Sequence, residues 1–326
     1  MKPARSEGPL KELRRLLSEA LQDRYTIERV IGSGGMAVVF AAQDLARERS
    51  VAIKVMRPEV ADSVATTRFI REILWSSRLQ HPHIVPLLDS GEAAGFPYAV
   101  MPLIEGETLA SRLTRPPRLE LGHALRYAGQ IASALDYAHQ KQVVHRDIKP
   151  ENILLSHGYA LVADFGIARA LGLASEVQLT GPGSPIGTLA YMSPEQAMGR
   201  ADIDGRTDIY SLACVTFEML TGRTAVDGVS VQQILRQQAT VSPPPIRSVR
   251  PDIPAPVAVA IDRSLDRDPA KRIQTAGEFA EAMGHGAVAV PVTHAPTPAG
   301  SRTGLWLVIG AVVAVVALLL TWYATS

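Results

Sequence analysis

Two acidic side chains, an amide and a lysine occur at a spacing that suits phosphoryl transfer. The run from His145 to Asn152 reads HRDIKPEN, and Asp164 opens the tripeptide DFG twelve residues later. Asp147 and Asn152 are five positions apart, so one short loop can carry both, and the next twelve residues suffice for a hairpin that returns the chain to the same place. Transfer from ATP needs an acceptor for the hydroxyl proton of the substrate and oxygen ligands for Mg2+. The spacing therefore predicts a site of that kind.

These residues resemble the catalytic and metal-binding loops of bacterial eukaryotic-like (Hanks-type) serine/threonine protein kinases, and the resemblance covers residues 25–283 in motif order. It implies an α+β, two-lobed protein kinase fold, with a small β-rich N-lobe containing one main helix and a larger helical C-lobe. By resemblance, Asp147 orients the substrate hydroxyl and accepts its proton, and Lys149 contacts the transferring phosphate. Asn152 and Asp164 would hold Mg2+, with Mn2+ as an alternative ion. ATP and Mg2+ are the expected cofactors.

The resemblance also implies a nucleotide pocket that begins at a glycine-rich hairpin. Such a hairpin lets backbone amides approach phosphate oxygens without a Cβ in the way. Ala37 stands where the family has its third glycine, and we expect nucleotide binding to survive because alanine is the smallest replacement. Taken alone, the hairpin is weak support, because glycine-rich hairpins are common. The implied ATP-binding residues are Ile31, Gly32, Ser33, Gly34, Gly35, Met36, Ala37, Val39, Ala52, Lys54, Glu72, Met101, Pro102 and Ile104.

Two features of this pocket involve charge and the adenine base. Lys54 lies in an apolar strand, and by resemblance it pairs with phosphates and with Glu72 in the helical segment 65–79. Read alone, Lys54 would be an edge or snorkelling lysine and Glu72 an exposed carboxylate. Met101 would be the gatekeeper, followed by a hinge whose carbonyl at Pro102 and amide two residues later face the base. Most family members have an acidic residue at the position of Pro102, but only its carbonyl is needed.

The segment 187–195, GTLAYMSPE, resembles the substrate-docking end of the activation segment in bacterial serine/threonine kinases, with Thr188 as a docking residue. Together with Lys149 it favours serine or threonine as the acceptor. The resemblance further implies a structural salt bridge between Glu195 and Arg272. It also implies that Asp208, buried on a helix, braces the catalytic loop.

Arg146, directly before the catalytic aspartate, indicates regulation. In kinases with this arginine, a phosphorylated activation segment is drawn to a basic pocket that orders the segment. Thr180 and Ser184 lie in the corresponding stretch, and we expect autophosphorylation, preferably at Thr180. The alternative is an unmodified polar loop.

Composition limits the remaining classes. With 33 basic and 32 acidic residues the formal net charge is +1, so we expect no nucleic acid partner. Cys214 is the only cysteine, which excludes a disulfide within the chain, and its apolar surroundings predict core packing.

The C-terminal region predicts a membrane anchor. Residues 305–323 read LWLVIGAVVAVVALLLTWY without a charge, which nearly matches a hydrocarbon layer of about 30 Å as a helix. The alternative is a buried core helix. Arg302 before the span favours a cytoplasmic kinase domain on a single-pass plasma membrane protein. Gly310 and Ala314 form a small-xxx-small pair that would allow a homodimer.

The expected organisation follows from these features. Leucines at 10, 13, 17 and 21 predict a helix over residues 10–22, strand-like runs follow from residue 25, and helical periodicity dominates from about residue 119. The expected divisions are an N-terminal helical extension (1–24), a kinase domain (25–284, with the N-lobe about 25–101 and the C-lobe about 102–284), a juxtamembrane linker (285–303), a transmembrane helix (304–323) and a short tail (324–326).

Two other function classes compete with a kinase that signals to protein substrates at the membrane. A pseudokinase scaffold would lack Lys54, Asp147 or Asp164, and all three are present. A small-molecule phosphotransferase would lack Lys149 and the docking segment 187–195, which this chain has. The sequence therefore favours a serine/threonine protein kinase.

Overall fold

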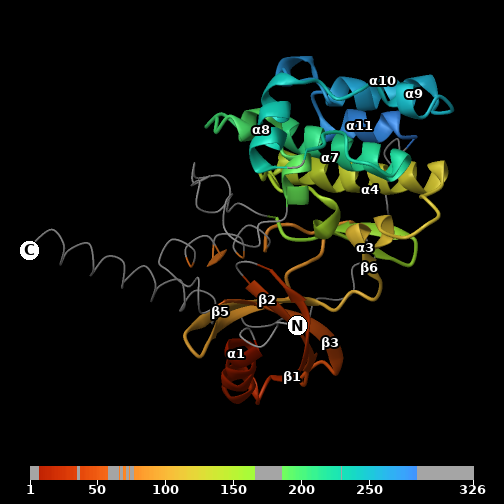
Figure 1. The fold of residues 1–326 in the computed structure, drawn as a ribbon. Coiled ribbons are helices and arrows are strands. Elements are labelled where there is room, and N and C mark those ends of the chain that lie inside the picture. The colour runs from red at the N-terminus through yellow and green to blue at the C-terminus, as the bar shows by residue number, and fades with distance from the viewer. Residues whose placement is uncertain are drawn as a thin grey trace, which may run out of the picture. The chain divides into compact units, whose positions relative to one another are not determined.

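The strand-like runs that start at Tyr25 form an antiparallel sheet with the order β1-β2-β3-β5-β4 (Figure 1). The computed structural model describes residues 7–34, 37–57, 66, 69–70, 73, 77–165, 186–228 and 230–284. The three strands predicted after Tyr25 are confirmed, and two more complete the sheet. The five are β1 (Tyr25–Ser33), β2 (Ala37–Asp44), β3 (Arg49–Met56), β4 (Asp89–Ala93) and β5 (Phe96–Pro102).

The two faces of this sheet bury different residues because side chains alternate along a strand. On one face, helix α1 (Glu7–Leu21) packs Leu13, Leu17 and Leu21 into a cluster with apolar residues of β2, β3 and β5. The helix predicted for residues 10–22 therefore forms, and it lies beside the first sheet (Figure 1), with its leucine stripe in the shared apolar cluster. The opposite face carries Lys54 and faces the pocket described below.

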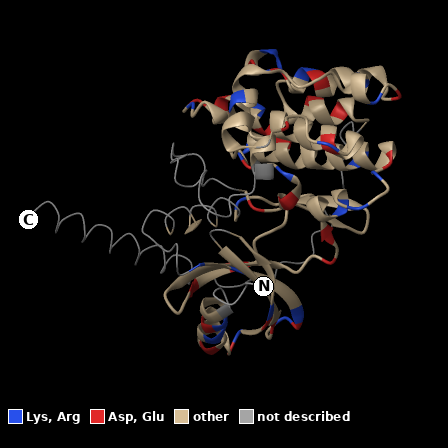
Figure 2. Cartoon of the chain, viewed as in Figure 1, with Lys and Arg blue, Asp and Glu red and all other residues tan. Residues whose placement is uncertain are grey.

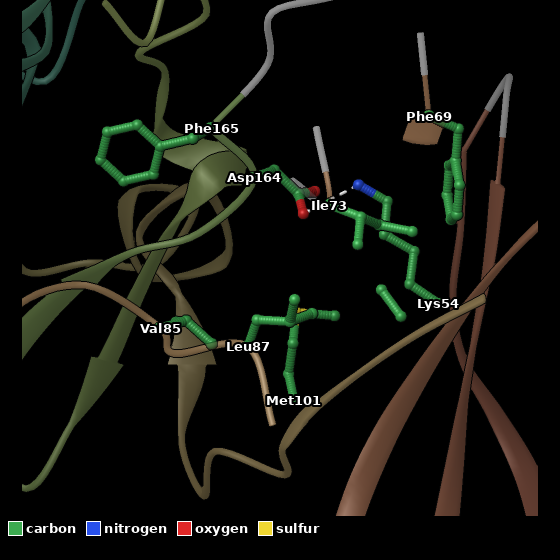
Figure 3. A pocket seen from close by; sticks show the side chains of 9 residues that line it. Lys54, Phe69, Ile73, Val85, Leu87, Met101, Asp164 and Phe165 are labelled. Atoms are coloured by element: carbon green, nitrogen blue, oxygen red, sulfur yellow. Dashed lines mark hydrogen bonds and ion pairs between the residues drawn. The ribbon is translucent and has the colours of Figure 1, made fainter. Parts of the chain in front are cut away.

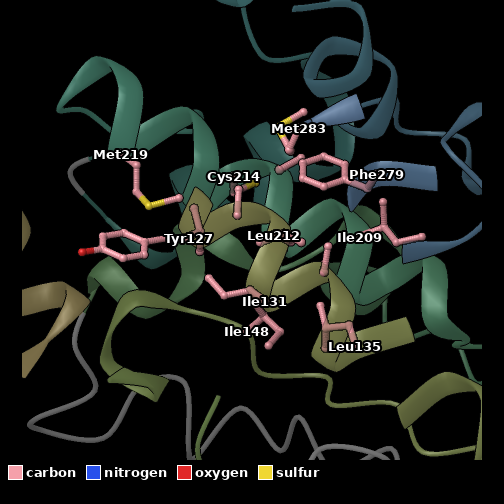
Figure 4. Packing of buried hydrophobic residues seen from close by; sticks show 14 of the residues in the cluster. Tyr127, Ile131, Leu135, Ile148, Ile209, Leu212, Cys214, Met219, Phe279 and Met283 are labelled. Atoms are coloured by element: carbon pink, nitrogen blue, oxygen red, sulfur yellow. The ribbon is translucent and has the colours of Figure 1, made fainter. Parts of the chain in front are cut away.

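The helices after residue 108 build a second core around α4 (Leu121–Gln140) and α7 (Gly205–Thr221) (Figure 4). Helix α7 is capped at its N-terminus by Asp204, whose side chain accepts from the backbone N–H of Arg206, and at its C-terminus by Gly222 in the left-handed conformation. Cys214 on α7 is buried in this core, as predicted. The helices are α3 (Leu109–Leu113), α4 (Leu121–Gln140), α6 (Pro194–Ala197), α7 (Gly205–Thr221), α8 (Val231–Thr240), α9 (Ile246–Val249), α10 (Ala255–Ser264) and α11 (Ala276–Ala282).

A small second sheet interrupts the helical part, and this was not foreseen beyond the hairpin expected between Asn152 and Asp164. That hairpin is confirmed, and a third strand pairs with its first strand. Strands of two to four residues are too short to show an alternating pattern, which explains the omission. The strands are β6 (Glu107–Thr108), β7 (Ile153–Ser156) and β8 (Tyr159–Val162).

The segment that precedes β4 ties the first sheet to the helical part. The backbone N–H of Val85 donates to the carbonyl of Val162 at 2.9 Å, and the N–H of Val162 donates to the carbonyl of His83 at 2.8 Å. The N–H of Gln80 donates to the hydroxyl of Tyr137 on α4 at 3.1 Å. This segment therefore runs beside β8, which leads directly to Asp164.

Several predictions concern residues outside the described part of the chain. These are the glycine-loop residues Gly35 and Met36, the pairing partner Glu72, the phosphorylation candidates Thr180 and Ser184, and residues 285–326 with the linker, span and tail. Within the described ranges, no helix is both long and apolar enough to cross a bilayer. Figure 2 shows acidic and basic residues interspersed over the described elements, in keeping with the near-zero net charge.

Candidate active site

The structure brings together the three polar residues predicted at the catalytic loop. Asp147 Oδ2 accepts from Lys149 Nζ at 2.8 Å and from Asn152 Nδ2 at 3.1 Å. The same Nδ2 donates to the Asp147 carbonyl at 2.8 Å. A 3-10 turn over Pro150–Asn152 makes this possible, because it folds Asn152 back onto the loop. The Asp147 carboxylate is thus held in one orientation by a cation and an amide.

A buried aspartate on α7 braces this loop from behind, as predicted. Asp208 Oδ2 accepts from the backbone N–H of His145 and from His139 Nε2, both at 2.8 Å, and Oδ1 accepts from the N–H of Arg146 at 2.7 Å. Burial opposes the charge of Asp208, but the hydrogen bond from His139, together with the histidines and the backbone N–H of Arg146 around the carboxylate, outweighs it and lowers the pKa of the carboxyl. Asp208 therefore remains an anion that accepts three hydrogen bonds.

Arg146 adopts a backbone conformation that costs energy. Its φ of +66° lies in the left-handed region, which a bulky residue occupies only when its surroundings enforce it. The enforcement is visible: Asp208 accepts from its N–H, and Gln196 Nε2 donates to its carbonyl at 2.8 Å. Sequence reasoning missed Gln196, whose spacing from Ser193 signals a capping box.

The end of the docking segment is anchored by the predicted Glu195–Arg272 salt bridge. The two side chains form a bidentate pair at 2.8 and 2.6 Å, and Arg272 is fully buried. Thr207 Oγ1 adds a hydrogen bond to Glu195 Oε1 at 2.6 Å. Of Thr188, only the backbone is described, in a 3-10 turn over Ile186–Tyr191.

His145 connects the catalytic loop to the segment after β8 that carries Asp164. Its ring Nδ1 accepts from the N–H of Asp147 at 3.2 Å, so Nε2 carries the proton and donates to the carbonyl of Ala163 at 3.0 Å. The carbonyl of Asn152 accepts from the N–H of Ala163 at 2.9 Å. The two predicted metal ligands are therefore held at one place by backbone and ring contacts.

Asp164 joins this loop to the first sheet. Its Oδ1 accepts from Lys54 Nζ at 2.9 Å, and Figure 3 shows the two side chains pointing toward each other. Desolvation favours the neutral acid, but the charge and hydrogen bond of Lys54 prevail and lower the pKa of Asp164. Its φ of +57° is a second left-handed non-glycine conformation in the site.

This ion pair lines a pocket together with apolar side chains, among them Met101 of β5 (Figure 3). The sheet register places Val39 opposite Lys54 and Ala52 opposite Met101, so several predicted nucleotide residues share one sheet face. Most of the apolar lining residues were not predicted, because in the sequence they look like ordinary buried core residues. The pocket is lined by Lys54, Phe69, Ile73, Val85, Leu87, Ala99, Met101, Asp164 and Phe165.

The glycine-rich hairpin and the hinge lie at the edges of this face. Ile31 to Ser33 end β1, and the N–H of Gly34 donates to the carbonyl of Ala37 at 2.9 Å. Gly32 lies opposite Val39. The side chain of Ala37 is buried in a cluster with Met56 and Phe69, so its methyl group packs against apolar neighbours.

At the hinge, Pro102 ends β5, and Ile104 follows in the connection to β6.

The oxygen donors at the site suit Mg2+, because Asp164 is ionised and the amide nitrogen of Asn152 already donates to Asp147. The amide oxygen of Asn152 therefore has the character of a ligand.

Comparisons with known proteins agree with this geometry. A protein kinase domain model matches residues 25–285. The chain is 42% identical over 266 residues to serine/threonine-protein kinase PrkC of Bacillus subtilis (strain 168), a match covering 81% of this chain and 40% of PrkC. It is 41% identical over 269 residues to PknE of Mycobacterium tuberculosis (strain ATCC 25618 / H37Rv), covering 81% and 46%. The identity to PknB of Mycolicibacterium smegmatis is 37% over 265 residues, covering 79% and 42%.

The matched region spans less than half the length of each of these relatives. The family model nevertheless covers most of this chain, and the motifs that carried the resemblance meet at one site. The resemblance to bacterial Hanks-type serine/threonine kinases is therefore confirmed, and the chain belongs to the protein kinase domain family.

Proposed function

We propose that this chain is an ATP-dependent protein kinase that phosphorylates serine and threonine hydroxyls of proteins. The observation that carries the proposal is the Asp147 carboxylate, held by Lys149 and Asn152 beside the strand that presents Asp164. Each relative named above is called a serine/threonine-protein kinase, which supports the acceptor class.

In the proposed reaction, the oxygen of the substrate hydroxyl forms a bond to the γ-phosphorus. Asp147 accepts the proton that this hydroxyl releases. The bond from that phosphorus to the bridging oxygen of ADP breaks, and ADP leaves with the electron pair. Lys149, 2.8 Å from Asp147, donates to the transferring phosphate and offsets its charge. A bound Mg2+ would neutralise phosphate charge, held by Asn152 and Asp164.

The nucleotide is proposed to lie against the sheet face that carries Lys54. The Lys54 ammonium is oriented by Asp164 at 2.9 Å, so it can donate to the phosphates without losing its counter-charge. The hinge from Met101 to Ile104 would receive adenine through the carbonyl of Pro102 and the amide of Ile104. The expected substrates are proteins that present a serine or threonine hydroxyl to this site.

The test of this proposal is transfer of labelled γ-phosphate by the full chain, purified in detergent, to itself and to a general protein acceptor. Asp147→Asn should lower the rate by about 100-fold or more, since a positioned base typically contributes that much. Asp252→Asn removes an exposed aspartate remote from the site and should leave the rate unchanged. A chain that binds ATP but transfers no phosphate would favour a nucleotide-binding scaffold instead.

We further propose activation by autophosphorylation, preferably at Thr180, with Ser184 as the second candidate. The support is Arg146, a half-buried cation whose backbone is tied to both Asp208 and Gln196, so that a phosphate drawn to it would act on the catalytic loop. Mass mapping of protein incubated with ATP checks this, and protein that carries no phosphate on residues 169–187 would contradict it.

The membrane anchor at residues 304–323 is also proposed, on the uncharged apolar sequence alone. The kinase domain would then act at the cytoplasmic face of the plasma membrane, with dimerisation through Gly310 and Ala314. Flotation of the full chain with liposomes, compared with a chain ending at residue 288, tests the anchor. Equal flotation of both chains would argue against it.

A further inference from the structure

An arginine outside the recognised motifs holds the glycine-rich hairpin. Arg57 directly follows β3, and its Nε donates to the carbonyl of Gly34 at 2.7 Å. Its Nη2 donates to the hydroxyl of Ser33. Both acceptors lie more than twenty positions earlier in the chain, in the loop proposed to cover the ATP phosphates.

The sheet explains why this arginine reaches that loop. Met56 pairs with Ala37 in the β2–β3 register, so the end of β3 lies beside the start of β2 and the hairpin turn. The turn itself is closed by the hydrogen bond from the N–H of Gly34 to the carbonyl of Ala37 at 2.9 Å. A guanidinium is a planar fork of donors, so one side chain can engage a carbonyl and a hydroxyl together.

We propose that Arg57 is a positioning residue that fixes the glycine-rich loop over the phosphates of ATP. The inference rests on the proposed function, because it assigns the phosphates to this loop. It explains how a loop with Ala37 in place of a glycine is held in one conformation. The carbonyl of Gly34 and the hydroxyl of Ser33 both accept hydrogen bonds from Arg57, the residue that follows β3. Arg57 acts on the nucleotide through these two residues.

Binding measurements with the full chain in detergent separate this role from a general structural one. With Mg2+ and a non-hydrolysable ATP analogue, Arg57→Ala should weaken binding about tenfold, the effect of losing charge-assisted hydrogen bonds. Adenosine binding should change less than about twofold in the same variant. Arg29→Ala, an exposed arginine on β1, is the matched control and should bind both ligands as the parent does. Equal loss of analogue and adenosine would overturn the proposal.

A double-mutant cycle tests whether Arg57 acts through Ser33. Ser33→Ala should weaken analogue binding less than Arg57→Ala, and the double variant should bind as Arg57→Ala does, because the same contact is removed twice. Arg57→Lys keeps the charge but offers no fork, so it should restore only part of the affinity. The positioning role would be refuted if Arg57→Lys restored the full affinity for the analogue and the effects of Ser33→Ala and Arg57→Ala were additive. That result would show that only the charge of Arg57 matters.

Kinetics add a readout that depends on transfer. In an active chain, Arg57→Ala should raise KM for ATP while leaving kcat and KM for the protein substrate close to the parent values. If the parent binds the analogue but transfers no phosphate, the proposed kinase activity fails while the binding cycle still decides the role of Arg57.

Discussion

Asp208 illustrates how one buried residue controls a site without contacting the proposed base. It accepts from two successive backbone N–H groups of the catalytic loop and from His139. Those bonds support the left-handed conformation of Arg146, which precedes the proposed base. At this scale the site depends on satisfied hydrogen bonds in a buried environment, where each unpaired donor costs about 1–3 kcal/mol.

Asp208→Asn should therefore lower kcat about tenfold or more while changing KM for ATP little. The amide oxygen can replace only one of the two carboxylate oxygens, so in either orientation its N–H group faces at least one donor that Asp208 now accepts from, and the brace on the loop is weakened. Asp262→Asn is the matched control, since Asp262 Oδ1 also accepts from a backbone N–H, that of Ile246 at 2.8 Å, away from the site. Steady-state kinetics of the two variants check this, and equal kcat losses would contradict it.

At the scale of elements, α1 completes the apolar core on one face of the first sheet. The protein kinase domain model begins at residue 25, yet the leucine stripe of α1 shares one apolar cluster with β2, β3 and β5. Without α1, residues such as Phe40 and Ile53, now fully buried, would meet water. The helix preceding the family domain is thus part of the N-lobe core.

Leu17→Ala should lower the free energy of unfolding by about 2–5 kcal/mol, the usual cost of a buried leucine cavity. Leu17 is fully buried, whereas Arg14 on the same helix is exposed, so Arg14→Ala is the control and should be close to neutral. Urea denaturation followed by circular dichroism measures both. A leucine variant as stable as the arginine variant would mean that α1 does not pack as described.

The connection from the hinge into β6 also depends on one glycine. Gly106 has φ +145°, and a Cβ built there would lie 2.0 Å from the carbonyl oxygen of Leu155. Gly158 is left-handed too, at φ +82°, but a Cβ there would meet nothing within 4 Å. The two positions therefore separate backbone strain from steric conflict.

Gly106→Ala should destabilise the protein clearly more than Gly158→Ala, which should cost about 1–3 kcal/mol through backbone strain alone. Relief of the clash must move the β6–β7 pair or the hinge, so nucleotide binding should weaken only in the Gly106 variant. Thermal unfolding and nucleotide titration of both variants give the comparison. Equal effects at the two positions would exclude a steric role for Leu155.

At the scale of the whole described unit, ion pairs connect distant segments, and two of them bear on the site. Lys54 and Asp164 link the first sheet to the catalytic region across 110 positions. Glu195 and Arg272 link the docking segment to the region before α11 across 77 positions. Desolvation opposes the charge of Glu195, but the hydrogen bonds and charge of Arg272 prevail and lower its pKa from the ordinary value of 4.5.

Because the folded pKa of Glu195 is lowered, its contribution to stability is complete above about pH 4.5 and is lost as pH falls further, through the folded pKa. Glu195→Gln should cost about 3–5 kcal/mol at pH 7, since it leaves a buried guanidinium without its counter-charge. The difference from the parent should stay flat from pH 7 to 5 and shrink below that. Urea unfolding across pH measures it.

Glu12→Gln provides the comparison for that series. Glu12 pairs with Arg15 at 2.6 Å, but both side chains are more than half exposed, so water already screens the pair. This variant should match the parent in stability at every pH. A Glu195 variant with the same flat behaviour would show that the buried pair contributes nothing to stability.

The sequence alone was sufficient for features set by neighbouring residues. The HRD and DFG motifs, the first three strands, the hairpin after Asn152 and the leucine stripe of α1 all follow from local spacing and alternation, and the resemblance extended this to Asp208 and the Glu195–Arg272 pair. Local patterns suffice there because side-chain direction repeats along a helix or strand.

Contacts between distant segments were decided by the tertiary structure. The fork of Arg57 on Ser33, the contact of Gln196 with Arg146, the apolar lining of the pocket and the sheet face that α1 covers are not visible in any local pattern. They arise from packing. Many apolar and polar residues have the same local character, and only the packed tertiary structure determines which of them become neighbours. The chemistry was therefore readable from short motifs, while the support that holds it in place required the folded chain.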